Sequence, residues 1–135
     1  MKSLVQKRAG YSMEKFGTKF YMFGGVKNYV GATNETWAFD YLKEEWEFIE
    51  SNNFFFFYCF FFYRFFVKAP TKPSPRMFHL SAVVGDVMII SGGSPTFSGG
   101  RLLSDFWMFH LCGEKKHTWE RLKFTIPIKN FAVHG

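Results

Sequence analysis

Four histidines and two cysteines are the side chains of this sequence best suited to metal or nucleophilic chemistry: His79, His110, His117, His134, Cys59 and Cys112. Structural zinc sites draw ligands from closely spaced Cys and His pairs. Neither His79 nor His110 has such a partner, and the cysteines form neither a metal motif nor a disulfide framework. Ser12 and Ser81 lie outside any nucleophile-elbow pattern, and no phosphate-binding glycine motif occurs. The sequence therefore predicts no enzyme, no metal and no cofactor.

A second set of residues occurs twice in the same order. Each unit opens with an arginine, which is followed sixteen positions later by a glycine pair: Arg8 and Gly24-Gly25, then Arg76 and Gly92-Gly93. An acidic residue next precedes a tryptophan by two positions, and a second tryptophan closes the unit: Glu35, Trp37 and Trp46, then Asp105, Trp107 and Trp119. Landmarks recurring in one order indicate a repeat architecture.

Each unit divides into four short segments rich in aromatic and β-branched residues and separated by Gly, Asn or Asp. We expect strands over residues 9–15, 19–23, 36–41 and 46–49, and over 80–84, 87–91, 106–111 and 119–122. The runs 20–23 and 87–90 are apolar at every position, as expected when both faces of a strand are covered. Outside one Phe-rich stretch no segment has a helical apolar period, so the predicted fold class is all-β.

Four antiparallel strands in a unit of about 45 to 50 residues are typical of a propeller blade. The chain resembles kelch repeats, whose pattern is Arg-X-X-His-Ser, an apolar strand, Gly-Gly, acidic-X-aromatic and then Trp. The second unit matches through Arg76, His79, Ser81, Gly92-Gly93, Asp105, Trp107 and Trp119. The first matches through Arg8, Ser12, Gly24-Gly25, Trp37 and Trp46, with Tyr11 at the histidine position.

This resemblance implies a partial kelch-type β-propeller of two four-stranded antiparallel blades. Kelch repeat 1 would span residues 8–50, a Phe-rich insert and Pro-rich linker 51–75, kelch repeat 2 residues 76–122, and 123–135 a tail or the start of a further blade. Most motif residues would then hold the blades together, with His79 bonded inside its own blade. We expect a fragment of a longer propeller, with Trp37 and Trp107 only half covered and the isolated chain insoluble or oligomeric.

The segment 54–68 does not fit the repeat, and it lies in the stretch that holds 9 of the 20 phenylalanines. A membrane span needs about 20 apolar residues, and this run is shorter and contains Arg64. A buried extra strand is a second interpretation. A third, which we favour as a hypothesis, is a translated pyrimidine tract from an unspliced intron, because Phe, Tyr and Cys have thymine-rich codons.

The formal net charge of +6 is scattered, and residues 1–50 carry equal numbers of basic and acidic side chains. No basic stripe alternates with aromatic residues, so nucleic-acid binding is not predicted. The N-terminus lacks the apolar core of a secretory signal, and we expect a cytoplasmic protein that is not membrane-bound.

The predicted function is therefore that of a protein–protein interaction module. Such a module could form the substrate-recognition part of a larger adaptor. Loops on a rigid scaffold suit binding, and the loop over residues 94–103 carries Phe97 and Arg101, the residue types that most often anchor interfaces. The kelch resemblance implies that Arg76, and by position Arg8, bind an acidic peptide of a protein partner. No small-molecule substrate is indicated. The alternative is a fragment of a kelch-propeller enzyme of the metal-dependent oxidase type.

Overall fold

The computed structural model describes residues 5–27, 31–51, 72–98 and 101–123, which form three antiparallel sheets and no helix. The first four-stranded sheet contains β2 (Ser12–Phe16), β3 (Lys19–Phe23), β5 (Thr36–Asp40) and β6 (Glu45–Ile49). The second contains β7 (Leu80–Val84), β8 (Val87–Ser91), β9 (Phe106–His110) and β10 (Trp119–Leu122). A two-stranded sheet joins β1 (Arg8–Ala9) to β4 (Val26–Lys27).

The prediction of an all-β fold is confirmed, and most strand positions agree with the expected ones. Each large sheet is a meander in which every strand pairs with the next one of its repeat. The first hairpins of the two sheets turn at Gly17 and Gly85, which have the same left-handed φ of 61°. Glycine adopts this conformation without a Cβ clash. The two hairpins therefore place their strands in the same register, with Phe16 opposite Lys19 and Val84 opposite Val87.

The expected strand over residues 9–15 is wrong, because the chain divides there into β1 and β2, which belong to different sheets. Gly10 stands at the break with a φ of 69°. A left-handed residue cannot continue an extended strand. Apolar and polar residue types alone gave no sign of this break.

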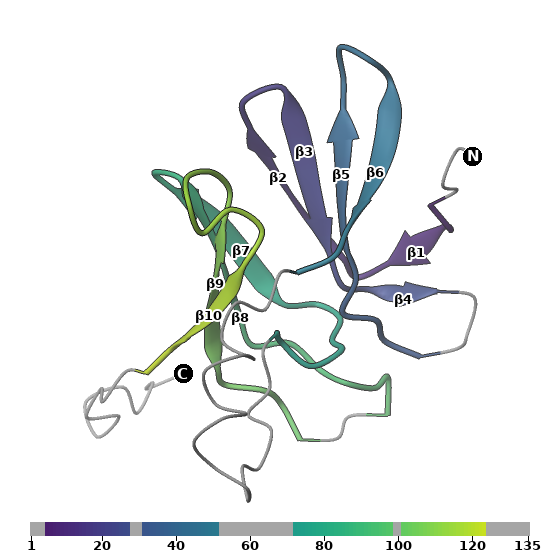
Figure 1. Ribbon diagram of the computed structural model, residues 1–135. Coiled ribbons are helices and arrows are strands. Elements are labelled where there is room, and N and C mark those ends of the chain that lie inside the picture. The colour runs from purple at the N-terminus through teal and green to yellow at the C-terminus, as the bar shows by residue number, and fades with distance from the viewer. Residues whose placement is uncertain (1–4, 28–30, 52–71, 99–100, 124–135) are drawn as a thin grey trace, which may run out of the picture.

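The two large sheets stand side by side, with β2 of the first next to β7 of the second (Figure 1). The apolar core lies between them. Phe23 of the first sheet and Phe109 of the second both contact Trp119, with ring centroids 4.9 and 4.7 Å apart. Tyr21 contacts Phe109 across the same gap. Burial of large aromatic rings is the main stabilising contribution to such an interface.

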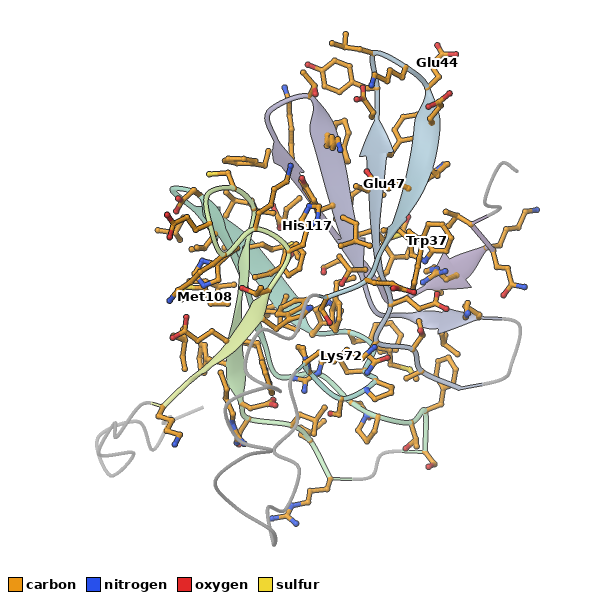
Figure 2. All side chains as sticks on the ribbon, viewed as in Figure 1. Trp37, Glu44, Glu47, Lys72, Met108 and His117 are labelled. Atoms are coloured by element: carbon orange, nitrogen blue, oxygen red, sulfur yellow. The ribbon has the colours of Figure 1, made fainter. Side chains whose placement is uncertain are left out.

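Trp37 and Trp107 were expected to be half covered, and this is wrong: their exposed fractions are 8% and 3%. Trp107 belongs to the core between the sheets. Trp37 lies on the opposite side of the first sheet (Figure 2), where it contacts the Phe48 ring at 5.0 Å and donates a hydrogen bond to Glu35. Phe48 of the same sheet and Glu35, just before β5, are thus among the groups that cover Trp37.

The apolar run of β8 is also covered less than expected. Met88 and Ile90 are fully buried, whereas Val87 and Ile89, on the other face, are only partly buried. The predicted insert over residues 54–68 and the segment 124–135 lie outside the described residues. No helix in the described part of the chain is long and apolar enough to cross a membrane.

Candidate functional site

A buried arginine organises the polar cluster at the base of the second sheet. Arg76 donates from Nη1 to Asp105 Oδ1 at 2.6 Å and from Nη2 to Asp105 Oδ2 at 2.9 Å. It also donates to the Gly92 carbonyl and to the carbonyl and hydroxyl of Ser74, each at 3.1 Å. Trp107 Nε1 donates to Asp105 Oδ2 at 2.7 Å. The carboxylate thus links the arginine to the tryptophan that follows it by two positions.

The first repeat forms the same cluster with looser contacts. Arg8 donates to Glu35 Oε2 at 3.1 Å and to the Gly24 carbonyl at 3.5 Å, and Trp37 Nε1 donates to the same Oε2 at 3.1 Å. Lys27 donates to Glu35 Oε1 at 2.9 Å. The longer glutamate leaves the carboxylate more exposed, 27% against 16% for Asp105. In both units the arginine is therefore bonded to the first glycine of the pair and to the acidic residue, which in turn accepts from the first tryptophan.

In both clusters the neighbouring hydrogen-bond donors lower the pKa of the carboxyl group. The hydrogen bond from Arg76 lowers the pKa of Asp105 to about 2, against the opposing effect of burial. For Glu35 burial acts to raise the pKa, but the hydrogen bonds from Lys27, Trp37 and Arg8 together lower it. Both carboxylates are therefore ionised at neutral pH, and neither is available as a general acid.

Glycine is required beside each cluster because backbone carbonyls approach closely there. Gly93 has a φ of 93°, and a Cβ at this position would lie 2.7 Å from the Met77 carbonyl oxygen. Gly25, its equivalent, has a φ of 91° and would meet the Ala9 carbonyl oxygen at 2.8 Å. Separations under 3.0 Å cannot be accommodated without moving backbone. The Gly-Gly pair is thus explained by the backbone.

His79 was expected to bond within its own blade, and this is wrong. Its Nε2 lies 2.7 Å from Ser12 Oγ in the first sheet. Ser81 nearby donates to Glu14 Oε1 at 2.6 Å, again between sheets. Burial, with a smaller effect of the Arg76 charge, lowers the pKa of His79 to about 4. The histidine is therefore neutral at pH 7.

The Ser12–His79 pair does not have the arrangement of a nucleophile and its base. Both residues are buried, with exposed fractions of 7% and 8%, and His79 Nδ1 has no hydrogen-bond partner within the described residues. A catalytic histidine is oriented through that second nitrogen. Within the described residues, no three His, Cys, Asp or Glu side chains are grouped to hold a metal ion. The pair acts as a polar link between the sheets.

The four predicted binding residues differ in their exposure to solvent: two are buried and two are exposed. Arg76 has no exposed surface, and the Arg8 side chain is 2% exposed. A peptide could reach neither guanidinium without displacing the bonds given above. Phe97 is 65% exposed and Arg101 is exposed, both in the loop between β8 and β9. The structure thus leaves only these two directly accessible.

Phe78, which the sequence analysis did not single out, adjoins this loop. Its ring is 63% exposed and lies edge-on to the Phe97 ring, with centroids 6.2 Å apart. Its φ of 57° is unusual for a bulky residue. Its equivalent in the first repeat is Gly10, and its N–H donates to the Gly10 carbonyl at 2.8 Å. Aligning the repeats residue by residue would have marked a phenylalanine in a glycine position.

Comparison of the chain with models of known protein families and with curated proteins finds no match.

Proposed function

We propose that this chain is a protein-interaction module made of two kelch-type propeller blades, which binds its partner through the loop between β8 and β9. The single observation that carries the proposal is the exposed aromatic pair Phe78 and Phe97, with an exposed arginine, Arg101, in the same loop as Phe97. Aromatic and arginine side chains are the commonest energetic anchors of protein interfaces. The kelch assignment is supported by two sheets with the same meander and the same arginine–carboxylate–tryptophan bonds.

Backbone strain at Phe78 supports a binding role for this ring. A non-glycine residue in the left-handed region costs about 1–3 kcal/mol, and such residues cluster at functional sites. The ring is mostly exposed, so burial of its side chain offsets little of that cost. A partner that covered Phe78 and Phe97 would provide the missing burial.

The proposed partner is a peptide segment that carries an apolar side chain next to a carboxylate. The apolar side chain would contact the two phenylalanine rings, and the carboxylate would pair with Arg101. Arg76 and Arg8 contribute indirectly in this proposal. Arg76 bonds the carbonyl of Gly92, where the loop leaves β8, and so fixes the loop rather than the ligand.

A displayed library of random peptides tests the proposal, with titration calorimetry on the enriched sequences. We expect peptides rich in Asp or Glu with an apolar residue, and at least roughly tenfold weaker binding by Phe97→Ala and by Arg101→Ala. Leu42→Ala is the matched control, because Leu42 is exposed on the hairpin between β5 and β6 and should bind like the parent. Peptides that bind both loop variants as tightly as the parent would place the binding surface elsewhere.

A further inference from the structure

Each large sheet has one face turned toward the other sheet and one turned away. In Figure 2, Trp37 lies on the side of the first sheet away from the second, and Met108 on the side of the second away from the first. Strand register assigns the neighbours. We call the Trp37 face the side of the first sheet that carries Met13, Met22, Trp37, Phe39 and Phe48; Met22 and Trp37 are buried there, and Met13 and Phe48 are exposed. We call the Met108 face the surface made by Leu80, Ala82, Val84, Ile89 and Met108.

Repeat equivalence relates these outer faces to the inner ones. Trp37 is the equivalent of Trp107, and Phe39 that of Phe109, both of which lie in the core between the sheets. The Trp37 face is therefore the same kind of surface as the one that the second sheet uses inside the chain. By the same rule Ile89 is the equivalent of Tyr21, so the Met108 face is the counterpart of the inner face of the first sheet.

The residues on the β2 and β7 edges show that the two outer faces are complementary to each other. Inside the chain the β2 and β7 edges meet through two polar pairs, Ser12 with His79 and Glu14 with Ser81. The hairpin registers make Leu80 the equivalent of Ser12 and Tyr11 that of His79. At the outer faces the first polar pair is thus replaced by an aliphatic side chain on one side and by the largely apolar ring of a tyrosine on the other. Leu80 is 77% exposed and Tyr11 is 43% exposed.

The second polar pair, Glu14 with Ser81, is also replaced by apolar residues at the outer faces. Ala82 is the equivalent of Glu14, and Met13 is the equivalent of Ser81. Ala82 is exposed, and Met13 is 39% exposed. If either face met an inner face, an apolar residue would oppose Ser12, Glu14, His79 or Ser81 and leave it without its bond. If the two outer faces met each other, both edge contacts would be apolar on both sides.

We propose that a second copy of this chain docks head to tail on the first, with its Met108 face on the Trp37 face. This interface continues the arrangement already present between the two sheets and does not depend on the proposed peptide binding. A heterologous contact of this kind closes into a ring when its rotation allows, and otherwise extends as a filament. Propellers contain about four to eight blades, so a closed ring would contain roughly two to four copies.

Sedimentation velocity and light scattering of the 135-residue chain across micromolar concentrations test the proposal. We expect a mass that is a multiple of 15.9 kDa. Leu80→Glu disables only the Met108 face and Met13→Lys only the Trp37 face, so each variant alone should be monomeric. Mixed together, they should form one defined 1:1 dimer, because each supplies the face that the other lacks. Leu42→Glu, at an equally exposed leucine off both faces, should assemble like the parent.

A parent chain that is monomeric at every concentration, or two folded variants that do not combine, would overturn the proposal. A Leu80→Glu chain that still dimerises would show a symmetric interface instead. Disulfide trapping decides the case in which a charged variant does not fold. With Cys59 and Cys112 replaced by serine, Tyr11→Cys with Leu80→Cys should oxidise into covalent multimers. Tyr11→Cys with Leu42→Cys should not, and equal cross-linking in the two would also reject the head-to-tail contact.

Discussion

Replacement of Asp105 by asparagine tests the role of the arginine cluster most directly. The change keeps the shape of the side chain but removes the charge that Arg76 contacts at 2.6 and 2.9 Å. Arg76 has no exposed surface. Removing one partner of a buried ion pair costs about 3–5 kcal/mol. The drop in the pKa of Asp105 from 3.8 to about 2 corresponds to roughly 2 kcal/mol, less some screening by solvent.

Since asparagine retains a hydrogen-bond acceptor and Asp105 is 16% exposed, we expect Asp105→Asn to lower the free energy of unfolding by about 2–3 kcal/mol. The assay is urea unfolding at pH 7, followed by tryptophan fluorescence. Glu35→Gln in the first repeat is the matched control. Its carboxylate is 27% exposed and makes one contact with Arg8, so the expected loss is about 1 kcal/mol. Equal losses in the two variants would refute the argument from burial.

The same carboxyl group predicts a pH dependence. Because the pKa of Asp105 is lower in the folded chain, its contribution to stability is complete above about pH 4 and is lost as the pH falls toward 2. Asp105→Asn should flatten this acid limb of the stability curve. An unchanged limb in the variant would assign acid unfolding to other groups.

Two further perturbations follow from backbone geometry and from a buried base. Gly93→Ala should lower the free energy of unfolding by at least about 3 kcal/mol in thermal unfolding, since its Cβ would lie 2.7 Å from a carbonyl oxygen. Gly17→Ala, at a left-handed position in open space, should cost about 1 kcal/mol. Similar losses in the two variants would exclude the steric explanation. Burial holds the pKa of His79 near 4, so folding should weaken by roughly 3 kcal/mol as the pH falls from 6.5 to 4, when the unfolded chain binds the proton more readily. His79→Gln should remove most of that slope, and a slope unchanged in this variant would assign it to other histidines.

Local pattern was sufficient to predict most of the fold. Leu80–Val84, Val87–Ser91 and Trp119–Leu122 are strands over the residues expected, because apolar runs bounded by glycine and polar turns specify short strands. Contacts between the repeats were not predictable in this way. The bond from His79 to Ser12 joins residues 67 positions apart, and nothing near either residue in the sequence indicates the other.

For the candidate site, the sequence allowed the exposure of two residues to be predicted but not the burial of a third. Phe97 and Arg101 lie in a polar, glycine-containing loop, and exposure follows from that composition. The complete burial of Arg76 could not be predicted from its neighbours in the sequence. An arginine becomes fully buried only when a distant carboxylate compensates its charge, here Asp105, 29 positions later. The repeat gave both residues a place in the motif but did not show that they bond.

The sequential strand order of the two sheets has a consequence for folding kinetics. The strands of each large sheet pair in the order in which they follow one another along the chain, with only the short β4 of the small sheet inserted between β3 and β5. Each sheet can therefore form from contacts of low sequence separation. Only the docking of one sheet on the other must close the long connection between Ile49 and Arg76. Closure entropy grows slowly, by about 0.6 kcal/mol per doubling of loop length. Deletion of residues 54–68, which would shorten that connection to somewhat less than half, should therefore change the docking equilibrium by only about 0.8 kcal/mol through chain entropy. The length of the chain between the repeats can vary widely while the sheets keep the same interface.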